Sequence, residues 1–385
     1  MRLVVARGTF VAGAVVRESY ASHAKIPYNN QVTRQLSEQS CMAGASRWKS
    51  IVRPLWNRVR SASIIDGGAD AKQTVFLSSG ARTGSTWVAE IINFENDYRF
   101  LFEPFSMVAP LCPSWAPRLL PDDRLRYIRP ECDDRDLVEQ AARVVSGRFR
   151  HPEVDQYNYN ARIVFDRRLV KETKSNLYLK WLHRRFPQMK LLLLMRHPIP
   201  TVLSRMHDIP EIDRARRNAE YRSLMFGQPD LVDDHLAPFR DVLESATTEV
   251  EQRLAVWCVQ NFVPLRQFAA GEVHIMFYET LCVDPESELR RLSAYLGEEL
   301  GDAKLGRALR RLRRPSSTIH REVKAFPDGW DVVSRWQSEA TADDVAAAKR
   351  LLGAFGLDAI YGDGPMPNVD APLSLMKRER SAVAS

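Results

Sequence analysis

The stretch TVFLSSGARTGSTW, residues 74–87, decides how the chain folds. Apolar residues come first, then small residues with one arginine and a glycine, and then the amphipathic segment WVAEII at 87–92. This order predicts a strand, a glycine-bearing loop and a helix N-terminus. Such a loop directs backbone N–H groups and the positive end of the helix dipole at an anion. We therefore expect phosphate or sulfate there, with an ordinary strand-to-helix turn as the alternative.

Strand and helix patterns alternate along the rest of the chain. Further strands are expected at 98–102, 169–171, 190–195 and 272–277. Helices are expected at 84–94, 134–149, 175–186, 247–269, 285–296, 301–312 and 343–355, with another beginning at Pro198. The run KLLLLM at 190–195 is apolar throughout, as in a central parallel strand, whereas the proline-rich segment 106–130 is expected to be irregular. The alternation predicts an α/β fold with a mostly parallel sheet.

Composition narrows the class of ligand. The chain has 385 residues and a net charge of +7, which favours an anionic ligand or surface. A charge of this size on a chain this long does not indicate nucleic acid binding, and we expect no nucleic-acid partner. The five cysteines are widely spaced and form no CxxC pair, which argues against a disulfide scaffold and favours a reducing compartment. No spacing typical of a metal site occurs, so no metal is expected.

Three segments are predicted from the changes in composition. Residues 1–72 are basic, poor in acids and weakly periodic, and we expect an N-terminal extension of unknown role. After it, we expect a single domain over residues 73–361 and a C-terminal tail over residues 362–385. No run approaches the roughly 18–20 apolar residues that span a bilayer, because Arg7 interrupts the apolar stretch at 3–16. We expect a cytoplasmic protein, with N-terminal targeting or membrane association as the alternative.

Polar residues follow the expected strands where each strand ends. The loop at 79–86 follows the first strand, Glu103 the second, Lys171 and Glu172 end the third, and Arg196 follows KLLLLM. Ligands of open parallel sheets bind at these carboxyl ends. A shared sheet would bring two arginines, a lysine and a glutamate into one crevice. Because charges are rarely buried without a partner, the cluster suits a ligand with separated anionic groups and one proton to be moved.

The loop is close to a Walker A motif but departs from it. Walker A has four residues between its glycines and a lysine after the second, whereas three residues separate Gly80 from Gly84 and Ser85 follows. The loop cation, Arg82, precedes Gly84, and KLLLLM is followed by Arg196 rather than by an aspartate suited to magnesium. An ordinary ATPase or kinase is therefore disfavoured. A P-loop nucleotide or small-molecule kinase and a non-catalytic binding module remain as alternatives.

Two motifs together resemble the sulfotransferases that use 3′-phosphoadenylyl sulfate (PAPS). The segment SSGARTGSTW resembles their 5′-phosphosulfate-binding loop, and Arg196-His197-Pro198 with Ser204 resembles their 3′-phosphate motif. The likeness covers residues 73–361. It implies an α/β fold with a P-loop-like central parallel β-sheet flanked by helices on both faces. It also implies an enzyme that moves a sulfonate group from PAPS to an acceptor hydroxyl and needs no metal.

The resemblance implies a set of donor-binding residues. Backbone amides of the loop would cradle the 5′-phosphosulfate, and Arg82 would neutralise charge on the bridging oxygen. Trp87 would lie against the adenine, with a core aromatic as the alternative, and the register that assigns Ser317 to the donor is open. The residues implied for the donor are Arg82, Thr83, Gly84, Ser85, Thr86, Trp87, Arg196, Ser204 and Ser317.

The resemblance also implies the catalytic groups and a class of acceptor. Glu103, in the segment LFEP, resembles the Phe-Glu-Pro segment of carbohydrate 6-O-sulfotransferases and would be the general base, with Glu172 as the alternative. Lys171 would place a second cation beside Arg82 on the transferring sulfonate. A carbohydrate or glycoconjugate hydroxyl is the expected acceptor; a phenol, a lipid or a natural-product alcohol is the alternative.

Overall fold

The computed structural model describes residues 55–108, 125–158, 162–208, 220–317 and 329–376. The chain consists of two compact units, Met1–Arg53 and Pro54–Ser385, and all the described residues belong to the second. Most of the predicted N-terminal extension, most of the proline-rich segment and the end of the C-terminal tail lie outside the described residues. Within the extension, residues 55–63 form a helix, Ile65–Asp66 forms strand β1 and Ala71–Gln73 forms the short helix η1.

A parallel sheet of five strands organises the second unit, as predicted. Its order is β3, β5, β2, β6 and β7, and every neighbouring pair is parallel. The strands are β2 (Thr74–Ser79), β3 (Tyr98–Phe102), β5 (Arg167–Glu172), β6 (Lys190–Met195) and β7 (His274–Phe277). A second sheet of two strands pairs β1 with β4 (Val164–Phe165).

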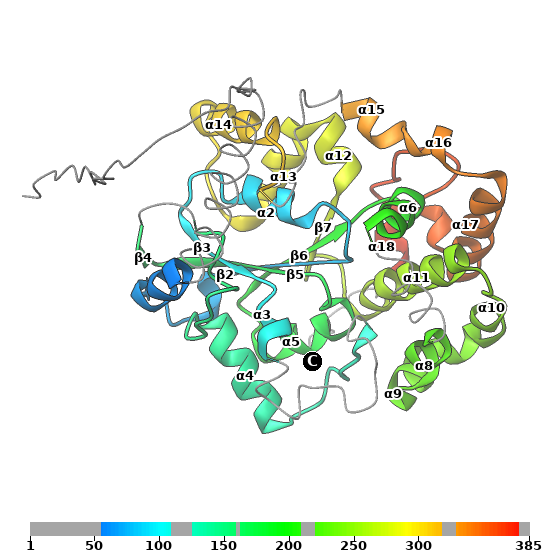
Figure 1. Ribbon diagram of the computed structural model, residues 1–385, viewed down its shortest axis with the longest axis horizontal. Coiled ribbons are helices and arrows are strands. Elements are labelled where there is room, and N and C mark those ends of the chain that lie inside the picture. The colour runs from blue at the N-terminus through cyan, green and yellow to red at the C-terminus, as the bar shows by residue number, and fades with distance from the viewer. Residues whose placement is uncertain (1–54, 109–124, 159–161, 209–219, 318–328, 377–385) are drawn as a thin grey trace, which may run out of the picture. The chain divides into compact units, whose positions relative to one another are not determined.

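Side chains of the central strands alternate between two cores, so helices must cover both faces of the sheet. Val75 and Leu77 join one core with α2 (Ser85–Ile92), α13 (Pro285–Leu296) and α14 (Asp302–Leu312). Phe76 joins the other core, with α4 (Arg135–Val145), α5 (Leu179–Arg185), α11 (Glu249–Gln267) and α17 (Ala342–Phe355). Figure 1 shows α2, α13 and α14 on one side of the sheet and α4 and α5 on the other. The predicted fold class is confirmed.

Shorter helices complete the second unit. Those near the strand ends are α3 (Pro104–Val108), η4 (Asn176–Tyr178), α6 (Pro198–Asp208) and α12 (Tyr278–Val283). A run that the sequence did not predict comprises α8 (Tyr221–Phe226), α9 (Pro229–Leu231), η5 (Val232–Leu236), η6 (Ala237–Phe239) and α10 (Arg240–Glu244). Toward the C-terminus lie α15 (Gly329–Ser334), α16 (Trp336–Glu339), η7 (Leu357–Ala359) and α18 (Ala371–Leu375).

Several predicted boundaries differ from the structure by a few residues, and two of these differences have a clear local cause. The helix expected over 134–149 ends at Val145, because Gly147 adopts a φ of 70° and turns the chain out of the helix. The start of the proline-rich segment, expected to be irregular, belongs to α3, where Pro104 occupies the first helical position that proline tolerates.

Candidate active site

The loop between β2 and α2 is shaped to leave backbone N–H groups free of side-chain caps. Gly84 is the N-cap of α2 with a φ of 82°, and no described side chain bonds to the first turn of this helix as a cap. A Cβ on Gly84 would lie 2.6 Å from Cε2 of Tyr278, so only glycine fits. Thr83 Oγ1 donates to the Gly80 carbonyl oxygen at 2.8 Å and braces the loop. The uncapped first turn is suited to an anion.

Three of the predicted donor-binding residues meet beside this loop. Arg82 Nε donates to Ser204 Oγ of α6 at 3.1 Å. Arg196 Nη1 donates to the carbonyl oxygen of Arg82 at 3.0 Å, and the carbonyl oxygen of Arg196 accepts from Trp257 Nε1 of α11 at 3.1 Å. Loop, strand end and helix thus bring two guanidinium groups and a hydroxyl together, although Ser204 lies 122 residues from Arg82 in the sequence.

Tyr278, for which we predicted no role, contacts several residues of this cluster. The guanidinium carbon of Arg196 lies 4.4 Å from the centroid of its ring. The centroid of the Trp87 ring lies 5.5 Å from that of the Tyr278 ring. Because Gly84 has no Cβ, it leaves room for the tyrosine ring. Tyr278 directly follows β7, so the rule that ligands bind at strand ends, extended to this strand, could have found it.

Trp87 and Ser317 are placed by protein contacts. Trp87 is 5% exposed, and its indole N–H lies 3.2 Å from the carbonyl oxygens of both Leu312 and Arg314. These are the contacts of the core aromatic that was the alternative to an adenine contact. The backbone N–H of Ser317 donates to Glu90 Oε1 of α2 at 3.1 Å, and its hydroxyl bonds to the same carboxylate. A contact of either residue with a donor stays a prediction.

Glu103 and Lys171 form an ion pair at the ends of β3 and β5. Lys171 Nζ lies 2.5 Å from Glu103 Oε1, and the Thr173 hydroxyl donates to the same oxygen at 3.1 Å. The Lys171 ammonium lies 4.5 Å from the centroid of the Phe102 ring. The side chain of Lys171 is 3% exposed and that of Glu103 is 25% exposed. The carboxylate of Glu103 is therefore held in one orientation and still reaches solvent.

Glu172, the alternative base, is placed differently. Its side chain is fully buried, and its two oxygens accept from the backbone N–H groups of Phe105 at 3.1 Å and Thr173 at 3.0 Å. Burial, together with the nearby negative charge of Glu103, raises the pKa of Glu172 to about 8. Its carboxylate is committed to the backbone, whereas that of Glu103 is accessible.

The residue after Arg196, His197, belongs to a buried cluster with Glu279, Tyr361 and Trp336. The backbone N–H of His197 donates to Glu279 Oε1 at 2.8 Å, and the Tyr361 hydroxyl donates to Glu279 Oε2 at 3.1 Å. The His197 ring stacks on Trp336 with centroids 4.3 Å apart. Burial, with the charge of Arg196 as a second cause, lowers the pKa of His197 to about 3, so the ring is neutral at physiological pH. This imidazole packs the site from behind and carries no charge for a phosphate.

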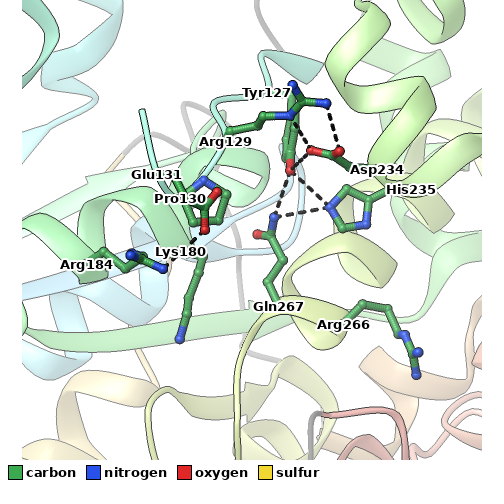
Figure 2. Close-up of a pocket in the computed structure, with 10 residues that line it drawn as sticks. All are labelled: Tyr127, Arg129, Pro130, Glu131, Lys180, Arg184, Asp234, His235, Arg266 and Gln267. Atoms are coloured by element: carbon green, nitrogen blue, oxygen red, sulfur yellow. Dashed lines mark hydrogen bonds and ion pairs between the residues drawn. The ribbon is translucent and has the colours of Figure 1, made fainter. Parts of the chain in front are cut away.

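A pocket of about 510 Å³ lies elsewhere, among residues outside the strands of the five-stranded sheet. Lys180 and Gln267 belong to its wall, and Lys180 pairs with Glu272, two residues before β7 begins. Figure 2 shows Gln267 and His235 grouped around the Tyr127 hydroxyl. None of the residues predicted for the site lines this pocket.

The described part of the chain holds neither a metal-binding cluster nor a membrane-spanning helix. Among these residues, no group of three or more histidine, cysteine, aspartate or glutamate side chains could hold a metal ion. No helix that they form has the length and apolar character needed to cross a membrane.

Comparison with known proteins defines the class. Residues 74–302 match the model of the family described as "Sulfotransferase family", which is more than half of the chain. The chain belongs to this sulfotransferase family, which confirms the resemblance seen in the loop and in the Arg196 motif and argues against the kinase alternative. No curated relative matches the sequence.

Solved structures that resemble this chain include three sulfotransferases. The sulfotransferase domain from the curacin biosynthetic pathway is 14% identical, with 73% of this chain and 96% of that one covered and a TM-score of 0.40. Mouse sulfotransferase SULT7A1, complexed with PAP, is 14% identical, with coverages of 81% and 89% and a TM-score of 0.37. A sulfotransferase from Alicyclobacillus acidocaldarius is 15% identical, with coverages of 72% and 95% and a TM-score of 0.30.

Proposed function

We propose that this protein transfers a sulfonate group from PAPS to a hydroxyl of a carbohydrate or glycoconjugate, with Glu103 as the general base. One observation carries the proposal: Arg82 of the donor loop, Arg196 and the Glu103–Lys171 ion pair lie at the carboxyl ends of neighbouring strands of one sheet. Membership of the sulfotransferase family supplies the reaction type.

The donor has two anionic ends, and the chain offers two sets of groups for them. Amides of Thr83, Gly84, Ser85 and Thr86 would hold the 5′-phosphosulfate at the uncapped start of α2. Arg196, with Ser204, would bind the 3′-phosphate, since a guanidinium fork and a hydroxyl suit one phosphate group. Of the cations, Arg82 is the one on the loop itself, so it would meet the bridging oxygen.

The transfer step needs one proton acceptor and positive charge at the leaving group. Glu103 would take the proton from the acceptor hydroxyl as its oxygen attacks the sulfur. The bond from sulfur to the bridging phosphate oxygen breaks, and 3′-phosphoadenosine 5′-phosphate (PAP) leaves with that electron pair. Arg82 would stabilise the charge that develops on the bridging oxygen, and Lys171 would contribute beside the sulfonate. Positioning and fixed charge would supply most of the rate enhancement.

The carbohydrate acceptor is supported by two features of the sequence. Glu103 lies in a Phe-Glu-Pro segment. The donor loop carries Arg82, as in the carbohydrate and protein-tyrosine sulfotransferases that it resembles, where cytosolic sulfotransferases carry lysine. A phenol, a lipid or a natural-product alcohol as acceptor would leave the donor site and the base unchanged. The acceptor is therefore tested separately from the donor.

The donor site is tested by equilibrium binding. We expect the protein to bind PAP at least about tenfold more tightly than adenosine 5′-phosphate, which lacks the 3′-phosphate, because a charge-assisted contact is worth roughly 1.5–3 kcal/mol. Arg196→Met should abolish this preference. Arg310→Met, at an exposed position of α14, is the matched control and should retain it. Equal affinity of the wild-type protein for both nucleotides would contradict the proposed donor.

A further inference from the structure

The backbone at Glu103 adopts a conformation that side chains disfavour. Its φ is 45°, in the left-handed region, and in the described part of the chain only Arg82 and Asn96 share this feature among residues other than glycine. Two of these three residues are predicted catalytic groups. Such a conformation persists only where surrounding contacts hold it. The contacts of the backbone next to Glu103 and of its carboxylate therefore identify the residues that orient this side chain.

One side chain makes contacts on both sides of Glu103. Glu172 Oε2 accepts from the backbone N–H of Phe105, two residues after Glu103, at 3.1 Å. Glu172 Oε1 accepts from the backbone N–H of Thr173 at 3.0 Å, and the hydroxyl of Thr173 donates to Glu103 Oε1 at 3.1 Å. The Glu172 carboxylate thus bonds to the turn that follows Glu103 and to the residue that orients the Glu103 carboxylate.

The sheet register places Glu172 beside this turn. β3 and β5 are parallel with Phe102 opposite Lys171, and the N–H of Glu103 continues the ladder by donating to the Lys171 carbonyl oxygen at 2.8 Å. Glu172 is the next residue along β5, and its side chain emerges on the face where α3 starts. A carboxylate, which accepts through both oxygens, matches two N–H donors; a glutamine would set an NH₂ group against one of them.

Burying the carboxyl group of Glu172 costs folding free energy, which suggests that a glutamate is kept at this position for a function. Glu172 is fully buried and takes part in none of the ion pairs among the described residues. The charged groups that face it are Glu103, Lys171 and Lys174. A buried carboxyl group that must ionise without an ion-pair partner disfavours the folded state, so packing alone does not explain a glutamate here.

We infer that Glu172 is the positioning residue for Glu103: its buried carboxylate holds the strained turn and the Thr173 hydroxyl so that Glu103 faces the acceptor. The inference rests on the proposed role of Glu103 as the base. It replaces the sequence-based alternative in which Glu172 itself takes the proton.

The ionisation of Glu172 gives the inference a pH signature. As the pH rises through a pKa of about 8 the Glu172 carboxyl loses its proton, and the ionised form accepts from both N–H groups and raises the proton affinity of Glu103. Below that pH it holds a proton that competes with these bonds. The kcat of the wild-type enzyme should therefore increase through an inflection on the alkaline side of neutrality, which a purely structural residue would not produce.

The test compares Glu172→Gln with Thr173→Val and with a matched control. We expect Glu172→Gln to lower kcat about 10- to 100-fold with the PAPS KM and the PAP affinity changed less than about twofold, and to remove the alkaline inflection. Thr173→Val should lower kcat and retain the inflection. Glu288→Gln, which changes another buried glutamate on α13, should retain both kcat and the inflection.

Each outcome separates the inference from the proposed function. If Glu103→Gln retains kcat, the base assignment fails. If Glu103→Gln is inactive while Glu172→Gln keeps kcat and the inflection, the positioning role alone is overturned. If Glu172→Gln loses as much activity as Glu103→Gln and still binds PAP, Glu172 is the base after all. If Glu172→Gln does not fold, Thr173→Val decides, and an unchanged kcat in that variant overturns the inference.

Discussion

Gly84 is fixed by two separate constraints, its φ of 82° and the ring of Tyr278 against it. The first constraint is the backbone conformation, and the second is the steric clash that a Cβ would have with the Tyr278 ring. Together they tie the donor loop to the residue that follows β7, and through Tyr278 to Arg196. A change at Gly84 should therefore affect the loop and the 3′-phosphate site together.

A pair of glycine substitutions separates these constraints. Gly271 also has a positive φ, 85°, but a Cβ there would meet nothing within 4 Å. Gly271→Ala should cost about 1 kcal/mol of unfolding free energy from backbone strain and leave PAP affinity unchanged. Gly84→Ala adds the clash with Tyr278 and should weaken PAP binding at least about tenfold. Urea unfolding and calorimetric titration measure both effects, and equal PAP affinity in the two variants would contradict the role of Tyr278.

At the residue scale, the sequence predicted positions better than contacts. Arg82 and Arg196 could be assigned to one cluster because each follows a strand, and the resemblance to the PAPS-dependent sulfotransferases added Ser204 of α6. Contacts such as those of Trp87 with the carbonyl oxygens near α14 depend on rotamers and tertiary packing, which no local pattern encodes. Thr173 was missed for the same reason, since a lone threonine after a strand carries no signal of its own.

Strands and long helices were predicted well because their patterns are strong. The apolar run of β6 and the helix α13, with its Asp284 cap, have the expected bounds. The short helices from α8 to α10 were not predicted, since helices of a few residues depend on packing rather than on intrinsic propensity. This run includes a π-helix at Val232–Leu236, which sequence patterns do not signal.

Strands β1, β3 and β5 are linked by a buried charge network. Asp66 of β1 pairs with Arg168 of β5 at 3.0 Å and with Arg99 of β3 at 3.4 Å, and Arg99 also pairs with Asp155 at 2.8 Å. All four side chains are at most 1% exposed. Asp66 lies in the segment predicted as an extension, so part of that segment packs on the sheet.

Removing one charge from this network should destabilise the fold. Asp66→Asn leaves two buried guanidinium groups with less negative charge, and we expect a loss of about 3–5 kcal/mol in unfolding free energy. Urea denaturation followed by circular dichroism measures it. Asp70→Asn, at an exposed position that pairs with Lys72, is the control and should shift the midpoint little. An equal, small shift in both variants would show that the network does not stabilise the sheet.

At the scale of the whole domain, the sheet collects the site from segments far apart in the sequence. The carboxyl ends of β2, β3, β5, β6 and β7 contribute the loop, Glu103, Lys171, Arg196 and Tyr278 in turn. The pocket of Figure 2 shares none of these residues. The topology therefore places these cationic side chains and Glu103 at one edge of the sheet, which is the arrangement that the proposed sulfonate transfer requires.

The transfer of radiolabelled sulfonate from PAPS to a panel of glycans, phenols, lipids and other alcohols tests this account most directly. We expect the wild-type protein to label a glycan hydroxyl, and Glu103→Gln to bind PAP normally while label transfer falls by a factor of at least about 100. Labelling of another class instead would replace the carbohydrate assignment and leave the donor site and base intact. No transfer to any class despite tight PAP binding, or undiminished transfer by Glu103→Gln, would contradict the account.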